Sequence, residues 1–123
     1  MRIRLVDTIP GFSVEFRDWD SDASSVTLGD LLWERVRREV ESFNQDGAEI
    51  YNGLVAPEES ERVLTGYRLK RRYALDAEQE YQRAVRAFEA NRFLVLAGGR
   101  PVEALGDEID LAAAHEVEFV RLS

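Results

Sequence analysis

The chain opens with two stretches in which apolar and polar residues alternate, residues 1–5 and 12–16. Alternation with a period of two is typical of a strand that buries one of its faces. Pro10 and Gly11 lie between the two stretches and favour a turn. The pattern therefore predicts an N-terminal β-hairpin, followed by a polar loop over residues 17–25.

A helical pattern follows this polar segment. Apolar residues recur every three or four positions over residues 28–43, which predicts a helix with one buried stripe. Thr27 comes just before the helix as a candidate N-cap, and Asp30 stands where a capping box would close. We expect the helix to end between Asn44 and Gly47, because glycine accepts a left-handed cap. Trp33 lies at the edge of the stripe, so it either packs in the core or faces a partner.

The segment Ala48–Leu75 has the least regular pattern. Residues 58–61 suggest the start of a short helix, and residues 67–73 form an extended, strongly basic stretch. A second helix is predicted from Asp76, with a capping-box glutamine three residues later and an asparagine at position 91 as its stop.

The last third of the chain predicts strands again. Residues 93–97 form a continuous apolar run that ends at the turn residues Gly98 and Gly99. Pro101 and Val102 suit a short edge segment, where a proline is tolerated. Residues 117–122 carry apolar side chains on both faces, as the central strand of a sheet requires.

Composition limits the classes of function that remain. A chain of 123 residues, 45% hydrophobic and 33% charged, fits one compact domain. Its net charge of −8 works against broad binding to nucleic acid or anionic membranes. The absence of cysteine excludes disulfides, thiolate catalysis and zinc sites built on sulfur, and it fits a reducing compartment. Since there is no apolar leader and no long hydrophobic run, we expect a cytoplasmic protein without a membrane anchor.

The element order and three segments resemble the ubiquitin-like β-grasp family. Residues 92–105 (RFLVLAGGRPVEAL) resemble the third and fourth strands of ubiquitin and of the molybdopterin- and thiamine-type sulfur carriers. Residues 107–122 (DEIDLAAAHEVEFVRL) are similar to the closing stretch of the family, and residues 26–40 (VTLGDLLWERVRREV) are similar to its helix. The resemblance implies an α+β fold: a single ubiquitin-like β-grasp domain over residues 1–123, with a mixed sheet packed on one main helix. It also implies a helical insertion at about residues 45–91.

The resemblance further implies a bacterial ubiquitin-like modifier or carrier that is not itself an enzyme. Its partners would be an activating enzyme, a conjugating enzyme where one is used, and a target protein. The family acts through a final Gly-Gly, because a narrow tunnel admits only bare backbone. Here the sequence ends in Leu122-Ser123, so we expect either that such a tail has been removed or that the fold is used for binding alone. The expected contact with partners is one sheet face, at Leu94, Leu96, Val120 and Leu122.

An alternative of a different class is a non-conjugated interaction subunit or adaptor that binds a partner protein through the insertion and the sheet face. Four basic residues in the insertion, flanked by two tyrosines, resemble surfaces that bind single-stranded nucleic acid. They could equally dock an acidic partner, or pair with acidic residues of the same chain. The net charge argues against nucleic acid as a partner. These four residues are Arg68, Lys70, Arg71 and Arg72.

The remaining candidates for catalysis or metal binding lack partners at a useful spacing. His115 is the only histidine and sits next to Glu116 in a predicted turn, where spacing identifies no convergent partners for a general base or a metal site. Asp18, Asp20 and Asp22 begin like a calcium loop, but the sixth and twelfth positions are not the glycine and glutamate that such a loop needs. We therefore expect no catalytic residue, no metal site and no cofactor.

Overall fold

The chain is described by a computed structural model and belongs to the α+β class, with a mixed sheet and two helices. It divides into two compact units. We call Met1–Leu31 with Phe88–Ser123 the sheet unit, and Leu32–Ala87 the inserted unit. The structure describes residues 2–11, 13–47, 49–63, 66–71 and 73–122.

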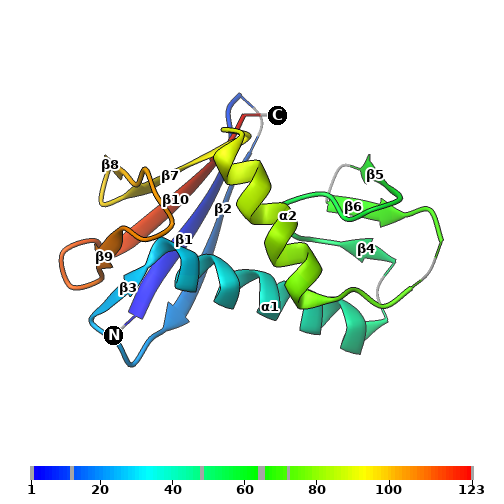
Figure 1. Cartoon of the computed structure of the whole chain (residues 1–123), viewed down its shortest axis with the longest axis horizontal. Coiled ribbons are helices and arrows are strands. Elements are labelled where there is room, and N and C mark those ends of the chain that lie inside the picture. The colour runs from blue at the N-terminus through cyan, green and yellow to red at the C-terminus, as the bar shows by residue number, and fades with distance from the viewer. Residues whose placement is uncertain (1, 12, 48, 64–65, 72, 123) are drawn as a thin grey trace. The chain divides into compact units, whose positions relative to one another are not determined.

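A five-stranded mixed sheet forms the sheet unit, with the strand order β2-β1-β10-β7-β8 (Figure 1). β1 and β10 pair in parallel, and every other neighbouring pair is antiparallel. The final strand is therefore the central one, as its two apolar faces predicted. The strands are β1 (Arg2–Ile9), β2 (Ser13–Asp20), β7 (Phe93–Ala97), β8 (Arg100–Pro101) and β10 (Glu116–Arg121).

The predicted hairpin is present, but its second strand is longer than the sequence pattern suggested. β2 continues to Asp20, so the prediction of a polar loop from residue 17 was wrong. Arg4 lies opposite Asp18 and forms an ion pair with it at 3.0 Å, and Arg2 pairs with Asp20 at 3.5 Å. Opposite charges on facing residues of two strands stabilise their pairing. The charged residues that suggested a loop therefore stabilise the second half of β2.

One face of the sheet is the core of this unit. Alternate residues of the three middle strands point to this face and are almost fully buried. The ring of Phe93 lies 5.8 Å from that of Phe88 and 6.2 Å from that of Phe119. The buried residues of these strands on this face include Ile3, Leu5, Phe93, Val95, Val117 and Phe119.

Short strands and hydrogen bonds complete the sheet unit. β3 (Ser25–Thr27) pairs with β9 (Glu108–Asp110). The helix α1 (Leu28–Asp46) begins in this unit, and the hydroxyl of Thr27 accepts a hydrogen bond from the N–H of Asp30 at 3.1 Å. The predicted N-cap is thus confirmed.

The inserted unit has a sheet of its own, with the order β4-β6-β5. Its strands are β4 (Ile50–Tyr51), β5 (Ser60–Val63) and β6 (Gly66–Leu69). The prediction that a helix begins at residues 58–61 was wrong. Glu59 has a φ of 51°, in the left-handed region that interrupts a helix, and β5 pairs with β6 instead.

The second predicted helix is present as α2 (Ala77–Glu89). The carboxylate of Asp76 accepts a hydrogen bond from the N–H of Glu78 at 3.0 Å, as an N-cap does. After the helix, Asn91 has a φ of 57°, which confirms it as the stop. Within the described residues, neither α1 nor α2 is long and apolar enough to cross a membrane.

Candidate functional site

The face of the sheet opposite the core carries the most exposed apolar side chains of the sheet unit; we call it the outer face. Strand register places its side chains in two rows across four strands. The first row runs Val14, Thr8, Val120 and Leu94, and the second runs Phe16, Val6, Glu118 and Leu96.

Several outer-face residues are open to solvent. The exposed fraction is 55% for Val14, 60% for Phe16, 43% for Leu94 and 52% for Leu122. Leu122 follows β10, and its N–H donates to the C=O of Arg92 at 2.9 Å, which continues the ladder beside β7. An exposed apolar patch of this kind on a folded surface is typical of a protein interaction site.

Polar groups fix the centre and one border of the outer face. In its middle, the hydroxyl of Thr8 donates to the carboxylate of Glu118 at 2.6 Å. At its border, the guanidinium of Arg4 lies 5.4 Å from the ring centre of Phe16 and donates to Asp18 at 3.0 Å. The hydrogen bond from Arg4 lowers the pKa of the Asp18 carboxyl, and the same bond raises the pKa of Arg4. The apolar rows thus end at a charged row.

All four residues that the sequence suggested for partner contact lie on this face. Val120 and Leu94 are direct register partners, and Leu96 belongs to the neighbouring row. The structure brings these residues together; their role in binding stays a prediction.

Sequence reasoning missed the contribution of β2. The alternation at Val14 and Phe16 suggested a buried face, yet both side chains are exposed. The positions of β2 on the core side are instead Glu15, Arg17 and Trp19, opposite Asp7, Leu5 and Ile3. Only the pairing register could decide this, since a shift of one residue moves every side chain to the other face.

The predicted basic patch is balanced by carboxylates of the same unit. Arg68 lies 3.8 Å from Glu61, and Arg71 lies 2.9 Å from Glu59. Arg71 also lies over the ring of Tyr73 at 5.7 Å. Lys70 is exposed, whereas Arg72 lies outside the described residues. This arrangement favours pairing within the chain over a free cationic surface.

Among its described residues, the inserted unit buries three charged side chains, two on α1 and one on α2. Arg35 and Glu39, one turn apart on α1, are buried and form an ion pair at 3.3 Å. Glu80 on α2 is 3% exposed and lies 3.5 Å from Arg83. Burial raises the pKa of the Glu80 carboxyl, Arg83 opposes this rise, and the nearby Asp76 adds to it. Burial likewise raises the pKa of Tyr73, whose hydroxyl is hydrogen-bonded to a main-chain carbonyl.

The other candidate residues occupy ordinary surface positions. His115 is exposed, and Asp18 and Asp20 pair with arginines of β1. Trp33 is 36% exposed and packs edge-on against Tyr81, with 5.4 Å between the ring centres. None of these residues forms part of a catalytic arrangement in the described part of the chain.

Comparisons with protein-family models, with curated proteins and with solved structures found no match for this chain. The outer face offers apolar side chains with a charged border, together with the Thr8–Glu118 hydrogen bond at its centre. Its function is therefore argued from recognition of another surface, not from a reaction.

Proposed function

We propose that this chain is a ubiquitin-like β-grasp domain that serves as a bacterial protein modifier or carrier in the cytoplasm. The fold assignment is supported by the N-terminal hairpin, the helix that follows it, and a last strand that lies parallel to the first at the centre of the sheet. The β-grasp fold has this arrangement. The three resembling segments fall on α1, on β7 with β8, and on β9 with β10.

The observation that carries the proposal is the outer face. Strands far apart in the sequence place apolar side chains side by side there. The face of a sheet that meets solvent usually carries polar side chains instead. Keeping Val14, Phe16 and Leu94 exposed costs solubility, and binding a partner protein offsets that cost. The partner that the proposal assigns to this face is an activating enzyme, and a conjugating enzyme where one is used.

The modifier function also requires a glycine-ended tail. β10 ends at Arg121, and the N–H of Leu122 donates to the C=O of Arg92 beside β7. The sequence of the gene beyond codon 123 tests this requirement directly. A glycine-ended extension is the expected result, and a stop codon immediately after Ser123 would contradict the modifier function.

The role of the outer face is tested with the full gene product and an activating enzyme encoded near it. The readout is ATP–pyrophosphate exchange by the activating enzyme, with the gene product as the varied substrate. We expect Leu94→Asp and Val120→Asp to raise the KM for the gene product roughly tenfold or more, since central interface residues dominate binding. Lys70→Asp is the control, because Lys70 is exposed in the inserted unit. Unchanged kinetics in both outer-face variants would show that another surface is recognised.

A second candidate is an adaptor that is never conjugated. It is favoured by the inserted unit, which has its own sheet and the partly exposed Trp33 packed against Tyr81. If the adaptor function is correct, Trp33→Ala or a double change of Arg68 and Arg71 should abolish capture of the native partner. Removal of any tail after Ser123 should then have no effect.

A further inference from the structure

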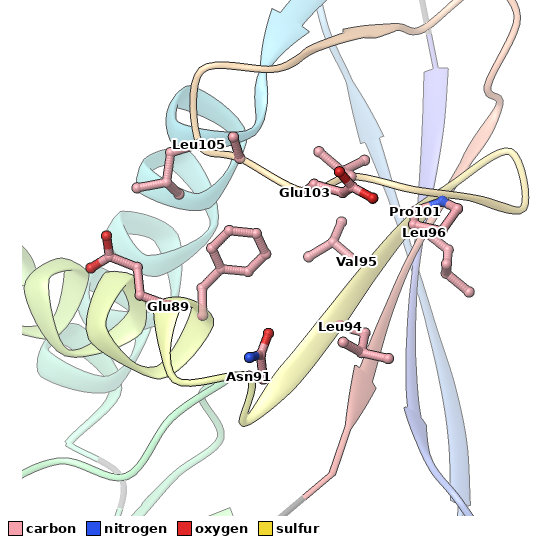
Figure 2. Close-up of a pocket in the computed structure, with 11 residues that line it drawn as sticks. Glu89, Asn91, Leu94, Val95, Leu96, Pro101, Glu103 and Leu105 are labelled. Carbon is pink, nitrogen blue, oxygen red and sulfur yellow. The ribbon is translucent and has the colours of Figure 1, made fainter.

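A groove lies beside β7, next to the short strand β8 and the loop that follows it (Figure 2). Its volume is about 630 Å³, within the range of ordinary ligand sites. All of the described residues that line it belong to the sheet unit. The apolar lining includes Phe88, Val95, Val102 and Leu105.

The groove runs along an incompletely covered strand edge. β8 pairs only with Leu96 and Ala97 of β7. One further bond, from the N–H of Val102 to the C=O of Val95 at 2.8 Å, extends the cover by one position. Because the N–H and C=O of a strand residue point to the same side, Val102 already lies opposite Val95. Phe93, two positions earlier on β7, points its main-chain groups to the same side, and no strand in the described part of the chain pairs with it there.

Figure 2 shows that the two faces of β7 meet this groove differently. Val95 points to one side of the strand, whereas Leu94 and Leu96 point to the other. All three line the groove, so it wraps around the edge of β7. An extended chain laid along this edge would reach both main-chain and side-chain groups.

The charge at the groove has a single sign. Glu89 at the end of α2 and Glu103 after β8 line it, and both are exposed. The described lining residues include no lysine or arginine. A ligand with positive charge beside an apolar group therefore complements the groove, and a basic segment is attracted by the net charge of −8 as well.

We propose that this groove binds an extended segment of a partner protein, in which an apolar side chain is flanked by lysine or arginine. The apolar side chain lies against Phe88 and Val95, and the basic side chain lies beside Glu103. The segment adds to the edge of β7 through main-chain hydrogen bonds with Phe93, the position that β8 and Val102 leave uncovered. The groove shares Leu94 and Leu96 with the outer face, whereas Phe88, Val102 and Leu105 belong to the groove and not to the outer-face rows.

The test uses random peptides displayed on phage and selected against the whole chain. One enriched peptide is then synthesised, and its affinity is measured by fluorescence anisotropy. We expect enriched sequences to combine an apolar residue with lysine or arginine. Glu103→Lys and Ala104→Trp should each weaken the synthetic peptide roughly tenfold or more.

Two control variants make the outcome specific. Glu49→Lys makes the same change of charge at an exposed site in the inserted unit, and Phe16→Asp disrupts the outer face. Both should bind the peptide as the unchanged chain does. Loss of binding in Phe16→Asp, with full binding in Ala104→Trp, would instead assign the peptide to the outer face and overturn the groove proposal.

Strand addition has its own readout. Amide chemical shifts of Phe93, Val95 and Val102 should move on titration with the peptide. In an added strand, every second N–H of the peptide faces β7. N-methylation at those positions should therefore abolish binding, whereas N-methylation at the positions between them should not. The proposal is overturned if no peptide is enriched or if enriched peptides lack basic residues. Equal binding to the unchanged chain and the groove variants would also overturn it.

Discussion

At the scale of single residues, the inserted unit buries charged side chains that a helical pattern alone would place at the surface. Arg35 is fully buried, and its guanidinium lies 3.3 Å from the carboxylate of Glu39. The other carboxylate oxygen of Glu39 accepts the N–H of Leu54 at 3.4 Å. Because a buried charge is tolerated only with partners, these groups depend on one another.

Arg35→Met is expected to destabilise the chain by about 3 to 5 kcal/mol, since it leaves the Glu39 carboxylate buried without its cation. The double change Arg35→Met with Glu39→Leu should recover most of this loss. Urea unfolding gives the free energies. Arg38→Met is the control: its exposed pair with Glu34 is worth less than about 1 kcal/mol. Equal losses for Arg35→Met and Arg38→Met would contradict the prediction.

Glu80 gives the chain a pH-dependent term in its stability. Its pKa in the folded chain lies above the ordinary value of 4.5, mainly because the carboxyl is buried. Between these two values the folded state holds the proton more tightly than the unfolded state does. The contribution of Glu80 to stability is therefore present below the ordinary value and is lost as the pH rises through the raised one.

Glu80→Gln should accordingly gain stability relative to the unchanged chain as the pH rises from about 4.5 to neutral. The difference in free energy of unfolding, measured in urea at both ends of this range, is the readout. Glu78→Gln serves as control, since Glu78 is exposed on the same helix. A difference for Glu80→Gln that does not change with pH would refute the explanation.

At the scale of elements, turns and caps decide where strands and helices end. The hairpin between β7 and β8 turns at Gly98 and Gly99, with φ of 56° and 81°. A type I′ turn needs positive φ at both central residues, which glycine adopts without strain. Asn91 and Glu59 adopt positive φ without being glycine: Asn91 follows the end of α2, and Glu59 lies in the turn before β5.

Gly99→Ala is expected to cost about 1 kcal/mol, because a side chain at this φ is strained. A Cβ at Gly99 would meet nothing within 4 Å, so crowding adds nothing to the cost. Gly106 is the matched control, as it is equally open but lies outside the left-handed region. Gly106→Ala should be neutral or stabilise by up to about 1 kcal/mol. Thermal or urea unfolding of both variants measures the difference, and equal effects would contradict the backbone argument.

At the scale of the whole molecule, net charge and surface chemistry disfavour nucleic acid as a partner. The charge of −8 repels polyanions, and the arginines described in the basic segment are paired with glutamates. The outer face is apolar with a charged border, and the groove beside β7 is apolar with acidic residues. Neither surface offers the cationic track that nucleic acid requires.

The chain should therefore bind a fluorescent single-stranded oligonucleotide no more tightly than about 10⁻⁴ M at physiological salt, as judged by anisotropy. Lowering the salt should not produce strong binding. If salt-dependent binding is found and Arg71→Ala abolishes it, the basic segment is a nucleic-acid site and the assignment of protein partners needs revision.

The elements with a strong internal pattern could be predicted from the sequence. The stripe of α1, the caps at Thr27 and Asp76, the stop at Asn91 and the turn after β7 depend on neighbouring residues alone. Local hydrogen bonds and backbone preferences determine such features. The apolar residues on both faces of β10 also predicted its central position.

Short strands and the composition of the outer face could not be predicted in this way. β3, β4, β5 and β9 have two to four residues each, and they are strands because of partners elsewhere in the chain. Leu94, Leu96, Val120 and Leu122 were proposed from a resemblance, and the residues of β2 that share their face, Val14 and Phe16, were not among them.

The sequence by itself placed the last strand at residues 117–122, one residue later than β10 at each end, and indicated that both of its faces are apolar. Only the tertiary structure decided which face of β2 meets solvent, and hence that Val14 joins the row of Val120 and that Phe16 joins the row of Leu96. The physical reason is register: side chains of a strand alternate between faces, so the partner strand selects the buried set. That choice rests on contacts between residues far apart in the chain.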